Sequence, residues 1–221
     1  NRERFLANQK WLSNLKVRAS IGTVGNQEIG DYQYSTAYTT STTGGNVHYT
    51  KSNAANSDLK WETTVSANIG IDASFLQDRI GVTLEYYHKE TLDLLLNVPV
   101  DVAKYGVSSQ LQNVSNVVNR GFEVSFEFTP IRNERLLWNI QGNLGYNINE
   151  MTSLGDYEEL NVNSYTILRK GEAVVSFYGL VFDGVVQADE DISILPTQNG
   201  SRPKVGQEKF RDINGDGKIN E

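Results

Sequence analysis

The chain has 221 residues with a formal net charge of −7, and 38% of its residues are apolar. It contains no cysteine, which excludes disulfides, thiolate metal sites and thiol nucleophiles. The acidic balance argues against nucleic acid as a partner, because phosphate binding needs clustered lysine and arginine. No run approaches ~18 consecutive apolar residues, so no transmembrane helix is expected.

Five stretches alternate between apolar and polar residues, and this period of two predicts β-strands. In chain order they cover approximately residues 15–23, 61–74, 79–90, 118–129 and 136–149. In the second stretch the odd positions from Trp61 to Ala73 are mostly apolar, whereas the even positions from Glu62 to Ser74 are polar or glycine. This stretch has 14 residues, compared with ~5–6 in soluble strands, and is long enough to cross a membrane at a tilt.

The connections between these strands alternate between short and long. Tight turns are expected at 75–78 and 130–135, and long outer loops at 24–60, 95–117 and 150–221. Short turns on one side and long loops on the other are typical of outer-membrane β-barrels, in which the turns are periplasmic. The mean hydropathy of −0.43 is compatible with this plan, because only every second strand residue faces lipid.

We therefore predict an all-β fold: a partial transmembrane antiparallel β-barrel in contact with outer-membrane lipid. Five strands are too few to close a barrel, since single-chain examples begin at about eight strands. The first residues, Asn-Arg-Glu-Arg, carry no signal peptide, so the segment is expected to belong to a longer, exported protein. Aromatic residues near the strand ends are expected to form the two interfacial girdles. They are Trp11, Trp61, Phe75, Tyr86, Tyr87, Trp138 and Tyr146.

The polar positions of the strands carry charges that would face the lumen of the barrel. These are Lys16, Arg18, Asp72, Glu85, Glu123 and Glu127. They would line a path for a hydrated solute, contact a plug, or pair with one another across strands, and pairing is the favoured interpretation for any single residue. Glu123 and Glu127 are separated by ~13 Å along one strand, too far for a glycosidase carboxylate pair. No catalytic motif is present, and the chain is not expected to be an enzyme.

A short acidic motif near the end of the sequence matches the opening of a D-x-N-x-D-G calcium loop. The candidate ligands are the side-chain oxygens of Asp212, Asn214 and Asp216 and the backbone carbonyl of Lys218. The bidentate glutamate of such loops would follow two positions after Glu221. The same residue types also favour a tight turn without metal. Both interpretations stay open; a bound calcium ion would be structural, and no cofactor is required.

The predicted outer loops are rich in tyrosine, accompanied by asparagine, threonine and serine. These residue types suit a sugar-binding surface, but they also hold loops together or contact a partner protein. The sequence does not separate these roles, so no substrate-binding residue is assigned. The tyrosines are Tyr32, Tyr34, Tyr38, Tyr49 and Tyr105.

Several stretches, in order along nearly the whole chain, resemble SusC/RagA-family TonB-dependent outer-membrane transporters. They are LKVRASIGTVGNQ (15–27), DLKWETTVSANIGID (58–72), YYHKETLDLLLNV (86–98), SSQLQNVSNVVNRGFEVSFEF (108–128), GEAVVSFYGLVFDGVVQADEDI (171–192) and GQEKFRDINGDGKIN (206–220). The resemblance implies a barrel of about 22 strands with an N-terminal plug, powered through TonB. It also implies a SusD-like surface lipoprotein as partner and oligosaccharides or oligopeptides as substrates. The segment would correspond to the later-middle part of the barrel, without the plug and the TonB box.

Two alternatives remain at this point. A secreted calcium-binding β-sandwich, either an adhesin or a carbohydrate-binding module, would share the alternation and the acidic motif. It would not explain strands of 12–14 residues or the asymmetry between turns and loops. A TonB-dependent siderophore receptor would share the barrel but not the GNQ, DLKWE and DINGDG stretches.

Overall fold

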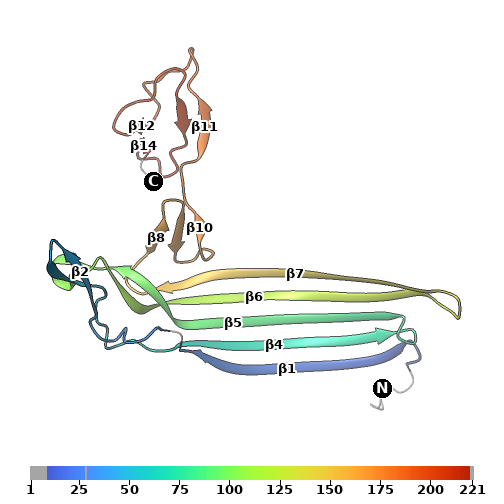
Figure 1. Cartoon of the computed structure of the whole chain (residues 1–221). Helices are drawn as coiled ribbons and strands as arrows, with labels where there is room; N and C mark the ends of the chain where they lie inside the picture. The colour runs from blue at the N-terminus through green and yellow to red at the C-terminus, as the bar shows by residue number, and fades with distance from the viewer. Residues whose placement is uncertain (1–8, 28, 220–221) are drawn as a thin grey trace. The chain divides into compact units, whose positions relative to one another are not determined.

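The computed structural model describes residues 9–27 and 29–219, and its structure is almost entirely β (Figure 1). The chain divides into two compact units, residues 1–160 with 168–174 and residues 161–167 with 175–221. Each unit is described by itself. No helix in the described part of the chain is long and apolar enough to cross a membrane.

The first unit is built on a five-stranded antiparallel sheet with the order β1-β4-β5-β6-β7. Its strands run side by side in Figure 1, and the ends of the longer ones extend past their neighbours. Each predicted stretch overlaps one of these strands, which contain 14 to 24 residues. Their bounds are β1 Leu12–Asn26, β4 Glu62–Phe75, β5 Ile80–Pro99, β6 Ser109–Arg132 and β7 Leu137–Leu154.

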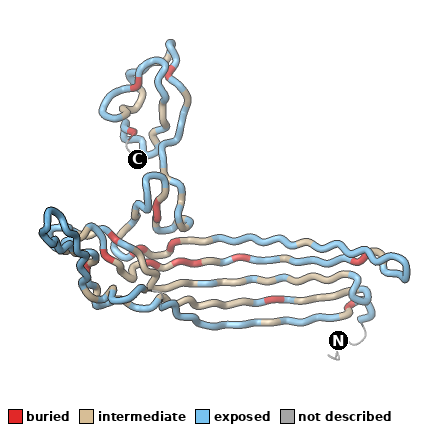
Figure 2. Tube along the Cα trace, in the orientation of Figure 1, coloured by how far each residue is buried: buried red, intermediate tan, exposed pale blue. Residues whose placement is uncertain are grey.

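The register across the sheet places apolar and polar residues on opposite faces. One row of directly paired residues is apolar: Val17, Ile71, Leu84, Val124 and Leu144. The adjacent row is polar: Lys16, Asp72, Thr83, Ser125 and Asn143. The apolar face is widely exposed, with 64% of Val17 and 70% of Leu144 accessible, and most of the strands are exposed or intermediate in Figure 2. Such a face requires an apolar environment around it.

The turn between β4 and β5 is as tight as predicted. Leu76, Gln77 and Asp78 all have left-handed φ values, between 53° and 62°, a conformation that costs energy for residues other than glycine. The Leu76 N–H donates to the Trp11 carbonyl at 2.9 Å, and the Asp78 N–H donates to the Ser13 hydroxyl oxygen at 3.1 Å. Contacts to Trp11, just before β1, and to Ser13, at the start of β1, therefore hold this turn in place.

The predicted outer loop at 95–117 is wrong. Strand β5 continues to Pro99 and β6 begins at Ser109, so only residues 100–108 connect them, with the short helix α1 (Val102–Tyr105). The ladder contains irregularities between Thr91 and Leu94 and between Leu94 and Leu95. A β-bulge inserts an extra residue, so the sequence loses its period of two there although the strands stay paired.

The other two predicted loops also contain strands. Residues 24–60 include the end of β1 and a hairpin of β2 (Tyr38–Thr43) and β3 (Asn46–Lys51). Its turn is Gly44-Gly45, with φ values of 60° and 82°, as two-residue hairpins prefer. In the third predicted loop, β7 continues to Leu154, and the described residues up to 219 contain seven short strands after it.

These short strands form small sheets of order β10-β9-β8, β11-β13 and β12-β14. The ladders between β10 and β9, between β11 and β13 and between β12 and β14 contain two residue pairs each, too few to give a clear alternating pattern in the sequence. The bounds are β8 Glu159–Asn163, β9 Thr166–Arg169, β10 Ser176–Phe177, β11 Phe182–Val185, β12 Thr197–Gln198, β13 Glu208–Phe210 and β14 Lys218–Ile219.

Candidate functional site: the polar face of the sheet

The charged residues predicted to share a face do so. Arg18, Gly70, Glu85, Glu123 and Gly145 form one row of directly paired residues, adjacent to the row that contains Lys16 and Asp72. Glu127 lies on the same face, where its carboxylate accepts a hydrogen bond from the Asn139 amide at 2.6 Å. The alternation of the strands is sufficient to bring them together.

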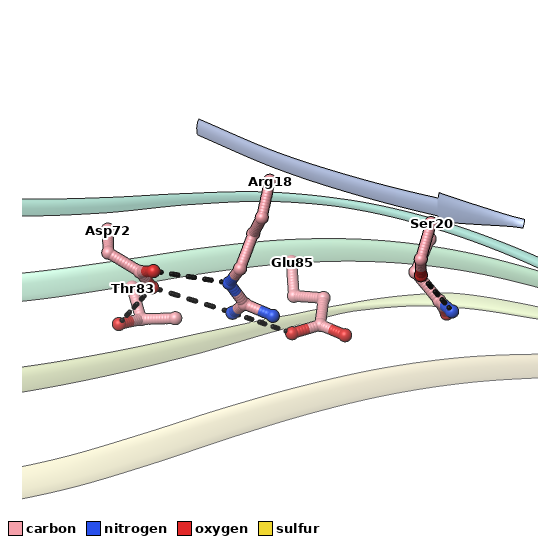
Figure 3. Close-up of polar contacts among 6 residues, drawn as sticks. Arg18, Ser20, Asp72, Thr83 and Glu85 are labelled. Atoms are coloured by element: carbon pink, nitrogen blue, oxygen red, sulfur yellow. Dashed lines mark hydrogen bonds and ion pairs between the residues drawn. The ribbon is translucent and has the colours of Figure 1, made fainter. Parts of the chain in front are cut away.

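Arg18 is the centre of an ion-pair cluster on this face (Figure 3). Its Nε lies 3.2 Å from Oδ2 of Asp72, and its Nη2 lies 2.8 Å from Oε2 of Glu85. The Thr83 hydroxyl donates to Oδ1 of the same aspartate at 3.1 Å. The side chains are 29–39% exposed, so solvent screens the ion pairs and weakens their contribution to stability. This confirms pairing across strands for Arg18, Asp72 and Glu85.

A glycine makes the reach of Arg18 possible. A Cβ atom at Gly70 would lie 2.9 Å from the Arg18 Cζ atom, so the guanidinium extends over the bare backbone of β4 to reach Glu85 on β5. The sequence shows Gly70 as one more small residue in the polar set. Its role depends on the strand register, which the alternation alone does not give.

Tyr87 uses a second glycine in the same way. Its ring lies over Gly121 of β6, and its hydroxyl donates to Oδ1 of Asn147 on β7 at 2.8 Å. The Lys89 ammonium lies 5.6 Å from the centre of the ring. The assignment of Tyr87 to an interfacial girdle is therefore wrong, because its side chain belongs to the polar face.

A shallow groove of about 440 Å³ runs along this part of the polar face. Glu85 and Glu123 are direct partners across β5 and β6, and only Glu85 is neutralised by Arg18. Within the described residues, the Glu123 side chain has no hydrogen bond or ion pair. The wall therefore presents amide, hydroxyl and carboxylate groups to whatever lies against it. Its lining includes Thr64, Asn68, Tyr87, Lys89, Asn119 and Asn147.

Aromatic side chains stand at both ends of the apolar face. At the turn end, Trp11 and Phe75 stack with their ring centres 5.6 Å apart. Nearer the loops, Phe122 and Tyr146 lie 5.6 Å apart in one row with Tyr86. From Ile80, the partner of Phe75, to Tyr86 is a distance of ~20 Å along β5. For strands tilted by ~40° this is ~15 Å in height, less than the ~25 Å of a complete apolar band, and the apolar positions of β4 continue beyond this row to Val65.

The tyrosines of the outer loops show no common site. The rings of Tyr32 and Tyr34 lie 6.5 Å apart, and the carbonyl of Tyr105 accepts a hydrogen bond from Lys51 at 2.6 Å. Tyr49 on β3 is 73% exposed. No substrate-binding residue is assigned from these contacts.

The acidic motif forms one tight turn in the second unit. The Asp212 carboxylate accepts hydrogen bonds from the N–H groups of Gly215 and Gly217, both at 2.7 Å. Oδ1 of Asn214 accepts from the Asp216 N–H at 3.1 Å, and Oδ1 of Asp216 accepts from the Lys218 N–H at 2.8 Å. These bonds leave free lone pairs on each oxygen.

Whether the turn holds calcium stays a prediction. It offers two carboxylates and one amide; in the described part of the chain, no three His, Asp or Glu side chains gather as a metal site. Asn220 and Glu221 lie outside the described residues.

The family model for TonB dependent receptor-like β-barrels matches residues 7–193. TonB-dependent receptor P39 of Formosa agariphila is 36% identical over 195 residues, which are 88% of this chain and 19% of the relative. TonB-dependent receptor SusC of Bacteroides thetaiotaomicron is 33% identical over 179 residues, which are 76% of this chain and 18% of SusC. The chain thus spans about a fifth of the length of these relatives.

Solved structures with a similar fold include the RagAB peptide transporter. It superimposes with a TM-score of 0.73 and 31% identity over 82% of this chain and 20% of the transporter chain. The RagAB peptide importer in its closed-closed state gives a TM-score of 0.74 with 28% identity, covering 95% of this chain and 24% of the importer chain. Both superpositions include most of this chain and only a quarter or less of the other.

Proposed function

Because the chain belongs to the TonB dependent receptor-like β-barrel family, whose members are outer-membrane proteins, we propose that it forms part of the wall of a SusC/RagA-type importer. The SusC and RagAB relatives support this subgroup over siderophore receptors. The secreted β-sandwich alternative is wrong, since the chain is a partial transmembrane barrel with long extracellular loops.

One observation carries the proposal: the long-stranded sheet has one apolar and one polar face. The apolar face, bounded by aromatic rows, faces lipid, and the polar face with Arg18, Tyr87 and Glu123 lines the water-filled lumen. A lumenal wall of hydrogen-bonding groups suits the passage of a hydrated solute. The similarity to the RagAB peptide transporter supports transport as the proposed role.

The proposed substrates are oligosaccharides or oligopeptides. The similarity to SusC and to the RagAB peptide transporter supports these two substrate classes and does not decide between them. The proposed partners are a SusD-like surface lipoprotein and TonB, which would act through a plug outside this segment. Capture at the outer face, plug rearrangement driven by TonB, and passage along the polar wall would follow in that order.

The test is uptake by cells that carry the complete receptor. Fluorescent oligosaccharides and oligopeptides are offered to the wild type, to a strain lacking the receptor, and to a strain lacking TonB. We expect uptake of one class to be lost in both deletion strains and restored by the receptor gene. Uptake that persists without TonB would contradict the proposed mechanism, and recovery of the receptor in the soluble fraction would contradict its location.

We also propose that the turn at 212–218 binds calcium as a structural ion of an extracellular loop. The oxygens of Asp212, Asn214 and Asp216 on one tight turn support it. Terbium luminescence of the receptor measures binding: Asp212→Asn should weaken it, whereas Asp189→Asn, outside the turn, should not. Equal binding by both variants would contradict the site.

A further inference from the structure

The polar face of the sheet becomes apolar at its loop end. The outermost regular row contains the directly paired residues Val24, Thr64, Thr91, Val117 and Met151. Val24 on β1 is 68% exposed, but Val117 on β6 is 7% exposed and Met151 on β7 is fully buried. Val24 and Val117 therefore lie in the same row on the same face of the sheet, but only Val117 is covered by other side chains.

The cover comes from the chain that follows β7. Val117, Met151, Leu154 and Leu168 form a buried apolar cluster. Figure 2 shows buried segments, in red, at the loop end of the long-stranded sheet. Tyr157, Leu160 and Val174 pack against it, together with Leu94 and Leu96 of β5. We name residues 155–160 and 168–174 the strap. It begins at Gly155, whose left-handed φ of 63° turns the chain.

Residues 171 and 172 of the strap lie along the edge of β7, where they exchange backbone hydrogen bonds with Met151, and the side chains of the strap that bury the cluster lie on the polar face and not on the apolar one. Strand β6 alternates regularly from Val117 to Glu127, and β7 alternates regularly from Gln141 to Met151. Val117 and Met151 therefore point to the same side as Glu123 and Glu127. Side chains that bury them must approach from that side.

Polar contacts fix the strap to the end of β7. The Met151 N–H donates to the Glu172 carbonyl at 2.8 Å, and the Met151 carbonyl accepts from the Gly171 N–H at 2.7 Å. The Val174 N–H donates to the Asn149 side chain at 2.9 Å. Within the strap, Arg169 pairs with Glu159 at 2.8 Å and with Glu172 at 3.3 Å. These two carboxylates raise the pKa of the guanidinium, with the Glu159 hydrogen bond as the larger cause.

We propose that the strap is a fixed constriction that folds inward and narrows the outer mouth of the barrel above β6 and β7. This rests on the proposed function, which makes the polar face the lumenal one. Val117 lies eleven residues from Phe128, the partner of Ile80 at the turn end. This is ~36 Å along the strand, or ~28 Å in height at a tilt of ~40°, so the strap stands at the outer edge of an apolar band of ~25 Å. A substrate entering on this side passes the strap before it reaches the groove at Tyr87.

The test is cysteine labelling from outside in cells that carry the complete receptor, because this segment contains no cysteine of its own. Val117→Cys places a cysteine beneath the strap. Val24→Cys places a cysteine in the same row of paired residues but away from the strap. A membrane-impermeant maleimide should label Cys at 24 rapidly and Cys at 117 slowly. Adding Leu168→Ala should raise labelling at 117 about 30-fold, since the buried leucine no longer holds the strap closed.

Leu180→Ala is the matched control, because it makes the same change at a residue that is 47% exposed. It should leave both labelling rates unchanged. Rapid labelling of Cys at 117 in the unmodified receptor would overturn the proposal, as would equal protection of both cysteines before and after the Leu168 change. Labelling does not require transport, so a receptor that fails to import while keeping this pattern would contradict the proposed function and leave the strap in place.

Discussion

Gly121 is the position at which the wall is least able to accept a larger residue. A Cβ atom there would clash with the carbonyl oxygen of Tyr146 and would lie 2.7 Å from the hydroxyl oxygen of Tyr87. Gly121→Ala must therefore move the β6–β7 backbone apart and displace the tyrosine ring from its hydrogen bond to Asn147. Overpacking costs about 1–3 kcal/mol, and a lost hydrogen bond adds about 1 kcal/mol, so we expect a total of about 2–4 kcal/mol.

Gly22→Ala is the matched control, because it lies on the same face and nothing stands within 4 Å of its added Cβ atom. Alanine is favoured over glycine within a strand by about 0.5–1 kcal/mol, so this variant should be neutral or slightly stabilised. The assay is the urea midpoint of unfolding for the complete receptor in lipid vesicles, followed by tryptophan fluorescence. If both variants unfold at the same midpoint, the reasoning about close packing at Gly121 is refuted.

Three further predictions follow from single contacts. Arg18→Gln leaves its two carboxylate partners without an ion pair and should slightly lower the urea midpoint in the same assay, by less in high salt. Asn113→Ala removes hydrogen bonds to both backbone groups of Lys60, at 2.8 and 2.9 Å, and should speed hydrogen exchange over residues 54–61. The Lys209 ammonium, and secondarily the Gln187 N–H, lower the pKa of Glu190 below its ordinary value of 4.5. The loop is therefore stabilised above that value and loses the contribution as the pH falls through the lowered pKa, so exchange over 187–209 should rise in acid.

Each of these three predictions has a control variant in the same chain. Arg132→Gln removes an arginine that has no ion pair among the described residues, so it should not change the midpoint. Asn119→Ala makes the Asn113 change at a side chain without a hydrogen bond in the described structure. Glu190→Gln should abolish the acid-dependent rise in exchange over 187–209; a rise that persists would show that another group is responsible.

The two-faced wall could be predicted because its cause is local. A strand between lipid and water needs apolar residues on one side only, and the period of two records that requirement directly. The ends of β5 and β6 could not be predicted, because bulges near Leu94 interrupt the period while the strands remain paired. Alternation shows which face of the sheet a residue occupies, but it does not show where a β-bulge leaves a residue of one strand without a partner on the next strand.

The ion-pair cluster shows the same limit. The sequence places Arg18, Asp72 and Glu85 on one face, but only the register brings Arg18 opposite Gly70 and within reach of both acids. Tyr87 was assigned to a girdle by its position near a strand end, although the parity of its strand puts it among polar residues. Parity is the more reliable signal, because the covalent geometry of the strand enforces it. The strap had no such signal, since apolar residues in a long connection do not show which face they cover.

Among the residues of the strands, glycine is the one whose structural role is interpreted most differently once the strand register is known. In a strand it costs about 0.5–1 kcal/mol relative to alanine, and read alone it marks a weak position. Here three glycines each stand directly opposite a long side chain of the preceding strand in the sheet, which lies over the bare backbone. The pairs are Arg18 with Gly70, Tyr87 with Gly121, and Phe126 with Gly142.

Two of these pairs lie on the lumenal face and one on the lipid face. A side chain that lies flat on its neighbour buries its own surface, which offsets the cost of the glycine. It also extends less into the space beyond the wall than an upright side chain would. On the lumenal face, the same pairing that stabilises the sheet therefore keeps the passage open, and a bulkier residue at Gly121 would disturb both.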